Sequence, residues 1–193
     1  MGNSKAAKAE NHDRIVRQAS IRFREAGIDG IGVADLMKDA GLTHGGFYRH
    51  FSSRDELVAE AVECALKDGG RAVTAIATSK LSRPAILAAL IDAYLSVAHR
   101  DGLASSCAVT TLAGDVARSN ERSRAAYAAQ VGVYLEVLTK LISDEKQKST
   151  RAKAIVALST LVGAVSISRA VNNEKLSKEI LKSATAELKS LLC

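Results

Sequence analysis

The run GLTHGGFYRHF at residues 41–51 constrains this chain more than any other segment. Residues 33–40 carry apolar side chains at helical spacing, which predicts a short helix with one face in the core. Gly41 ends that helix, because glycine readily takes the left-handed backbone found just past a helix. Phe47 and Phe51, four residues apart, predict a second short helix. Two helices joined by a short turn containing glycine form the helix-turn-helix unit that reads DNA.

Several small or polar side chains of this run lie outside the predicted core. Thr43 is expected to cap the second helix through its side-chain oxygen. Two glycines disfavour so short a helix, and close approach to a phosphate backbone would explain them. Arg49 can pair with a guanine edge or a phosphate, and Arg54 lies in a first helical turn, where free N–H groups favour phosphate. The alternative is an ordinary helix surface beside two core phenylalanines, but the helix-turn-helix context favours DNA contact. The predicted DNA-contacting residues are Thr43, His44, Gly45, Gly46, Tyr48, Arg49, His50 and Arg54.

The block from about Arg14 to Leu66 resembles the N-terminal domain of TetR/AcrR-family transcriptional regulators. Two positions depart from the family pattern: Gly32 stands where the family usually has Ser or Thr, and His44 stands where it usually has Lys. The residues that carry the resemblance are Phe23, Ala26, Gly27, Asp35, Leu36, Ala40, Gly41, Leu42, Thr43, Gly45, Phe47, Tyr48, His50, Phe51, Ser53, Arg54, Asp55, Glu56 and Leu57.

This resemblance implies an all-α protein of two domains. Residues 8–68 would form a three-helix DNA-binding domain, with the helix-turn-helix at about 32–51. Residues 69–193 would form a helical ligand-binding and dimerisation domain whose last two helices pair with those of a second subunit. The implied partners are a near-palindromic double-stranded DNA operator, a small-molecule effector and a second copy of the chain.

The helices expected along the chain follow from apolar spacing, caps and breakers. Ser53 and Glu56 predict a capping box, and Gly69-Gly70 is expected to interrupt the helix that it starts. Pro84 predicts another helix start, with an end near Gly102. The remaining helices are expected at about 12–26, 104–118, 121–142, 150–171 and 177–192.

Composition narrows the class further. Of 193 residues, 47% are apolar, 4% are aromatic and one is proline, which favours helices over a β-sandwich. No apolar run approaches the roughly 20 residues of a membrane span, and the first dozen residues lack the apolar core of a signal peptide. We therefore expect a soluble cytoplasmic protein with no membrane partner. The net charge is +6, but residues 1–60 hold nine basic and nine acidic side chains, so overall charge does not indicate DNA binding.

The three cysteines, Cys64, Cys107 and Cys193, predict neither a disulfide framework nor a metal site, and no cofactor is expected. Cys107 lies near the start of a predicted helix, where the partial positive charge of the helix end makes a thiol reactive. It could therefore act as a sensor whose modification releases DNA. Free cysteine is also among the most buried residue types, so a simple core role is the alternative.

The tyrosines of the second domain have two interpretations that weigh about equally. Tyr94, Tyr127 and Tyr134 could line an effector pocket between helices, or they could be amphipathic core residues. His99 belongs to the same candidate sensing set, although a cation near a helix C-terminus is the alternative for this residue.

Two other functions compete with transcriptional regulation. A helical-bundle enzyme has no support, because the chain lacks a Glu-x-x-His pair, an HExxH motif, a Walker loop and a GxGxxG motif, and no catalytic residue is predicted. A protein-binding helical adaptor that does not bind DNA is the other alternative.

Overall fold

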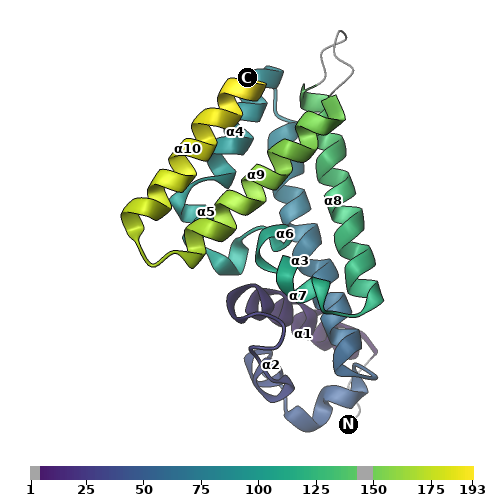
Figure 1. Ribbon diagram of the computed structural model, residues 1–193. Helices are drawn as coiled ribbons and strands as arrows, with labels where there is room; N and C mark the ends of the chain where they lie inside the picture. Colours follow the sequence, from purple (N-terminus) through teal and green to yellow (C-terminus); the bar gives the residue numbers. More distant parts are fainter. Residues whose placement is uncertain (1–4, 143–149) are drawn as a thin grey trace.

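The computed structural model describes residues 5–142 and 150–193, and this part of the chain is built from helices without a β-strand (Figure 1). The predicted all-α class is therefore confirmed. The elements are α1 (Lys5–Ala26), α2 (Val33–Asp39), the 3₁₀ helix η1 (His44–Arg49), α3 (Arg54–Ala77), α4 (Arg83–Tyr94), α5 (Val97–Asp101), η2 (Leu103–Ser105), α6 (Ala108–Thr111), α7 (Ala113–Ala117), α8 (Glu121–Ile142), α9 (Thr150–Ala170) and α10 (Glu174–Leu192).

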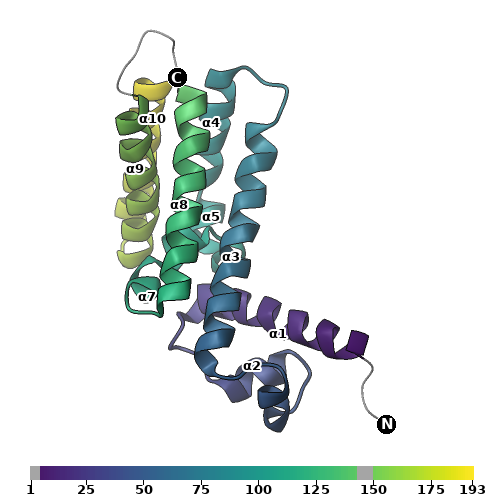
Figure 2. The ribbon, with the colours of Figure 1, turned by 90° about the vertical axis from the view of Figure 1, so that its right-hand side faces the viewer.

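Two parts are evident in the views (Figures 1 and 2). We call α1, α2, η1 and the first turns of α3 the head, and the remaining helices the body. In Figure 2, α1 runs sideways from the base of α3, while α3 rises into the body beside α8. A single helix therefore joins the two parts, and the domain boundary expected between residues 68 and 69 falls inside it.

The head has a core of aromatic side chains from α1 and from the segment around η1. Phe23, Phe47 and Phe51 are almost fully buried together with Leu36 and Met37. The two left-handed glycines lie where the helix ends require them, with φ of 78° at Gly27 and 69° at Gly41. Helix α1 itself begins several residues before the expected position 12.

Helix α3 is continuous through Gly69-Gly70, so the predicted interruption is wrong. A Cβ added to Gly69 would lie 2.8 Å from Tyr134 Oη, and one added to Gly70 would lie 3.1 Å from Gln130 Nε2. The glycines therefore allow α8 to approach α3 closely. At the start of α3, Ser53 caps as predicted by accepting a hydrogen bond from Glu56 N, but the Glu56 carboxylate returns to Ser52 instead of completing the box at Ser53.

The middle of the chain is more broken than its apolar spacing predicts. The helix expected to end near Gly102 stops at Tyr94, and Ser96 then caps the separate helix α5 by accepting from His99 N. The helix expected at 104–118 is three pieces, η2, α6 and α7, with one break at Ser106 and Cys107, where Ser106 has an extended backbone, and a second at Leu112. These short pieces pack beneath α9 and beside α3 (Figure 1).

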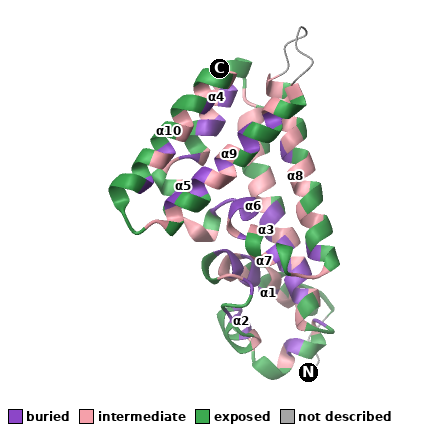
Figure 3. Ribbon diagram, in the orientation of Figure 1, coloured by how far each residue is buried: buried purple, intermediate pink, exposed green. Residues whose placement is uncertain are grey.

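Helices α9 and α10 form a layer on one side of the body (Figure 2), and exposed residues recur along both helices (Figure 3). Asn173 caps α10, which begins three residues earlier than predicted. Helix α9 is long and apolar enough to cross a membrane by length and composition alone, a property shared by core helices of soluble proteins, and it packs here against α8 and α10. The outward side of the layer retains exposed apolar side chains: Ile155, Val156, Ile167, Leu176 and Leu191.

Candidate DNA-binding face and sensing region

The segment η1 presents one anchored side and one exposed side. Phe47, like the nearby Phe51, is buried, whereas the Tyr48 side chain is 77% exposed and stands edge-on to the Phe47 ring at 5.2 Å. The element is a 3₁₀ helix of six residues, shorter than the expected recognition helix. Thr43 precedes η1 but its side chain forms no capping hydrogen bond, so the predicted cap is wrong. The Thr43 hydroxyl is therefore not used to cap η1.

Neither the backbone nor the packing of the head requires glycine at the two glycine positions of η1. Neither Gly45 nor Gly46 has a positive φ. A Cβ on Gly45 would meet no atom within 4 Å, and a Cβ on Gly46 would make ordinary contacts with Met37 Cε at 3.7 Å and Thr43 Oγ1 at 3.8 Å. A constraint from outside the molecule, such as a phosphate backbone lying against η1, therefore explains Gly45 better than internal packing does.

Arg49 and His44 lie exposed beside Tyr48. Within residues 5–142 and 150–193, no hydrogen bond or ion pair engages the Arg49 guanidinium. His50 lies inward: its ring is 6.3 Å from the His12 ring of α1, and its Nδ1 is buried without a hydrogen-bond partner. Burial, with His12 and Lys8 nearby, lowers the pKa of His50. His50 is therefore placed toward α1 and not on the exposed side of η1 as predicted.

Arg54 has a structural role that the sequence did not predict. Its Nη2 donates to Ile28 O at 2.5 Å, and its Nη1 lies 3.2 Å from Asp29 Oδ1. The guanidinium therefore ties the loop between α1 and α2 to the start of α3. These bonds hold the guanidinium against the head, so the predicted phosphate contact of Arg54 would have to use its remaining N–H groups.

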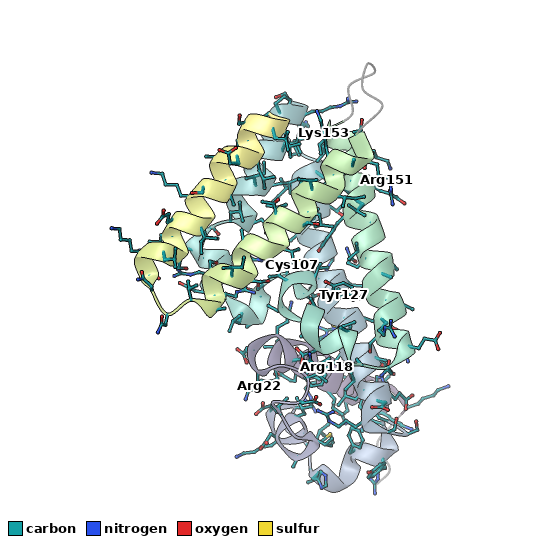
Figure 4. The ribbon with its side chains drawn as sticks, viewed as in Figure 1. Arg22, Cys107, Arg118, Tyr127, Arg151 and Lys153 are labelled. Carbon is teal, nitrogen blue, oxygen red and sulfur yellow. The ribbon has the colours of Figure 1, made fainter. Side chains whose placement is uncertain are left out.

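The three tyrosines of the body converge on one short segment, residues 107–110. Figure 4 labels Cys107 of this segment and Tyr127. Burial raises the pKa of all three phenols, so their hydroxyls stay protonated and act in hydrogen bonds. The contacts are Tyr94 Oη to Thr110 Oγ1 at 2.6 Å, Tyr127 Oη donating to Val109 O at 2.7 Å, and Tyr134 Oη to Cys107 Sγ at 3.7 Å.

Cys107 is 7% exposed and begins α6, which has only four residues. The helix predicted at 104–118 does not form, and so short a helix as α6 has little dipole to act on this thiol. Instead the Cys107 N–H donates to His99 Nε2 at 3.0 Å, while His99 Nδ1 donates to Tyr94 O at 2.6 Å. Burial lowers the pKa of His99, Arg169 adds to this, and the bond to Tyr94 O opposes it. His99 is thus a neutral connector and not the cation considered above.

Sequence reasoning missed Ser106 and Arg24, which join the head to the body. Ser106 Oγ contacts His99 Nε2 at 3.1 Å and Arg169 Nη2 at 2.5 Å, and Ser106 O lies 3.5 Å from Arg24 Nη1. The Arg24 side chain on α1 is 4% exposed, and burial lowers its pKa. Nothing in the sequence separates Arg24 from the other basic residues of α1, since its burial depends on how α1 meets the body.

The other two cysteines have no comparable setting. Cys64 is half-buried on α3, and Cys193 is exposed at the chain end. Within the described ranges 5–142 and 150–193, no group of three or more His, Cys, Asp or Glu side chains could hold a metal ion.

Similar proteins share this arrangement. Residues 15–61 match the family model described as "Bacterial regulatory proteins, tetR family". A TetR transcriptional regulator from Chloroflexus aurantiacus J-10-FL is 23% identical, with a TM-score of 0.79 over 95% of this chain and 94% of that chain. The reduced form of NemR from Escherichia coli is 18% identical, with a TM-score of 0.81 over 95% and 97%. A TetR-family regulator from Cytophaga hutchinsonii is 17% identical, with a TM-score of 0.80 over 100% and 98%.

No curated protein matches the sequence significantly. At these identities the solved structures establish the fold alone, which extends over nearly the whole chain. The family model identifies the helix-turn-helix domain within that fold. Residues 15–61 therefore match a domain of the TetR type, within a chain whose whole fold resembles solved TetR-family regulators.

Proposed function

We propose that this protein is a cytoplasmic, homodimeric repressor that leaves its operator when the segment around Cys107 is modified or displaced. The observation that carries the proposal is the convergence of Tyr94, Tyr127 and Tyr134 on residues 107–110. A change at this segment has a direct route to the head, because Ser106 contacts Arg24 of α1 and Cys107 packs against α3.

The DNA-contacting surface would be the exposed side of η1. Thr43, Tyr48 and backbone N–H groups near Gly45 suit phosphate oxygens, while Arg49 is free to pair with a guanine edge or a phosphate. His44 and Gly46 lie in the same stretch and complete the proposed contact set. His50 and Arg54 are left out of it, because their side chains serve the head itself.

A group added to the Cys107 thiol would disturb the contact between this segment and α3, because the added atoms need space. A Cβ placed on Gly69 would be 3.9 Å from Cys107 Sγ, so α3 passes the sulfur with little room. An adduct on the sulfur must displace α3, Tyr134 or α6. Since α3 continues directly into the head, such a displacement would change the position of η1 relative to a partner subunit.

A bound small-molecule effector is the second candidate trigger. The three tyrosine hydroxyls are already bonded to residues 107–110, so a ligand that uses them would have to compete with these bonds. This favours the thiol. One of the solved structures with a similar fold is the reduced form of NemR, and redox control of the present protein would be consistent with that likeness.

The proposed dimer would use the outward side of α9 and α10. Ile155 and Ile167 of α9 are 46% and 54% exposed, and the smaller Ser159 and Gly163 between them permit close approach of a second helix pair. Leu181 and Leu188 of α10, by contrast, are buried within their own subunit. The interface is thus proposed on the opposite side of the layer.

The thiol trigger is tested by N-ethylmaleimide, whose C=C bond adds the thiol S–H. Operator DNA labelled with fluorescein is bound to wild-type protein, Cys107→Ser and the control Cys64→Ser/Cys193→Ser, and release is followed by anisotropy. We expect N-ethylmaleimide to release the wild type and the control but not Cys107→Ser. Equal release of all three would place the trigger elsewhere, and no release of any would favour the small-molecule effector.

A further inference from the structure

We propose that the angle between α1 and α3 is a binding site for an organic anion with an apolar body. A groove of about 900 Å³ lies there, within the size range of small-molecule sites. One side of α1 and one side of α3 form its walls, and η2 closes one end. Figure 2 shows the angle between the two helices, where α1 runs sideways from the base of α3.

The charges of the groove favour an anion. Three of its acidic side chains have partners: Glu60 is hydrogen-bonded to His12, while Glu63 pairs with Arg122 and Asp68 pairs with Arg71 and Arg24. Asp13 is the exception, and it lies exposed toward the start of α1.

Two cations of the groove have no such partner. Arg17 of α1 and Lys67 of α3 line the groove and are exposed, and within residues 5–142 and 150–193 neither forms an ion pair. They come from opposite walls, so both can approach one carboxylate, sulfonate or phosphate group lying between them. Paired acids and unpaired bases give the groove a positive surplus that a bound anion would neutralise.

The floor of the groove supplies a third cation. Arg24 is buried there, and apart from its bond to Ser20 O its contacts are long: 3.5 Å to Ser106 O and 3.7 Å to Asp68 Oδ2. A buried guanidinium with such long contacts has donors left for an incoming oxygen. The remaining lining is largely apolar and would face the body of the ligand: Val16, Ile21, Cys64, Ala72 and Ala104.

Occupation of this groove would bear on regulation, a consequence that rests on the proposed function. Its walls belong to the head through α1 and to the connecting helix through α3, while η2 belongs to the body. A ligand held by Arg17 and Lys67 together would fix the angle between α1 and α3. The binding itself can be measured without DNA.

The test uses 8-anilinonaphthalene-1-sulfonate, an apolar aromatic anion that fluoresces when it leaves water. The full chain is titrated without DNA, and stoichiometry is taken from calorimetry. The variant Arg17→Glu/Lys67→Glu reverses both unpaired cations. The control Lys38→Glu/Lys80→Glu makes the same charge change at exposed lysines outside the groove. Circular dichroism confirms that each variant is folded.

We expect one probe per chain, a loss of about tenfold or more in affinity for Arg17→Glu/Lys67→Glu, and a change below about twofold for the control. The proposal is overturned if the wild type does not bind, if the groove variant binds as tightly as the wild type, or if the control loses as much affinity. Failure here leaves release at Cys107 unaffected, because that experiment measures DNA and this one does not.

Discussion

Gly41 and Gly45, four residues apart, have different roles: we expect the first to serve the fold and the second to serve DNA binding. Gly41 has a left-handed φ of 69° that a side chain would oppose, whereas Gly45 has neither a positive φ nor an atom near its missing Cβ. Substitution by alanine should therefore lower stability at Gly41 and lower operator affinity at Gly45.

Gly41→Ala should lower the free energy of unfolding by about 1–2 kcal/mol, the cost of a left-handed non-glycine residue. Gly45→Ala should leave it within roughly 0.5 kcal/mol, yet weaken operator binding about tenfold because the methyl group meets the DNA backbone. Urea denaturation and fluorescence anisotropy measure the two effects. Full operator affinity in a folded Gly45→Ala variant would remove this contact.

Arg49 and Arg54 form a second matched pair. Arg49→Ala should weaken specific DNA binding by about 1–3 kcal/mol if it reads a base, or should weaken all sequences evenly with a shallower salt slope if it only contacts phosphate. Arg54→Ala should instead reduce stability by about 1–2 kcal/mol, since it loses its bonds to Ile28 and Asp29. Denaturation and salt-dependent anisotropy separate the two roles. Unchanged operator affinity in Arg49→Ala would exclude Arg49 from the interface.

At the scale of elements, the crossing of α3 and α8 depends on Gly69. Its Cβ would lie 2.8 Å from Tyr134 Oη, so Gly69→Ala should cost about 1–3 kcal/mol of stability through overpacking. Tyr134→Phe removes the oxygen in the way, so the same glycine change should cost less in that background. A double-mutant cycle by urea denaturation measures the coupling. Additive costs would contradict this close crossing.

The contact between α5 and α6 should be sensitive to pH through His99. Its pKa is lowered in the folded protein, so the unfolded state takes up a proton first as the pH falls below its usual value of about 6.5. Stability is therefore full above about pH 6.5 and decreases below it. His50, whose pKa is also lowered, contributes in the same direction.

His99→Gln keeps an acceptor for Cys107 N–H but cannot titrate. Melting temperatures between about pH 7.5 and 5.5 should fall less for this variant than for the wild type, with the remaining fall due in part to His50. An identical fall in both proteins would show that His99 does not carry this dependence.

The sequence predicted helices best where local features, such as the spacing of apolar residues on one face, determine them. The apolar spacing of α8 and the left-handed Gly27 and Gly41 specify helices and ends locally, and these predictions are confirmed. The sequence failed where a partner far along the chain decides the structure. Gly69 reads as a breaker until Tyr134 packs against it, and residues 104–118 have helical spacing although distant contacts hold them as short pieces.

The candidate site divides in the same way. Tyr48 and Arg49 could be placed on the exposed side of η1 because Phe47 and Phe51 fix the opposite side. The structural role of Arg54 was missed because its partners, the carbonyl and carboxylate of the preceding loop, carry no sequence signal.

At the scale of the whole molecule, the proposed dimer determines how two heads reach one operator. Ile155→Glu/Ile167→Glu places charges on the outward side of α9 and should give folded monomers that bind the operator poorly. Leu181→Glu should unfold the chain, because that side chain is buried within the subunit. Val133→Glu, at an exposed position of α8, is the matched control, and this variant should stay dimeric. Light scattering gives the mass, and a dimeric Ile155→Glu/Ile167→Glu variant would place the interface elsewhere.

The most direct test is footprinting on the DNA upstream of the chain's own reading frame, with wild type and Arg49→Ala compared at several salt concentrations. A twofold dimer predicts two protected half-sites in a near-palindrome, with centres roughly 34–36 Å apart or a multiple of that distance. Protection should weaken in Arg49→Ala and as salt rises. Absence of protection at low salt, or equal protection by both proteins, would contradict the proposal that η1 reads an operator next to this gene.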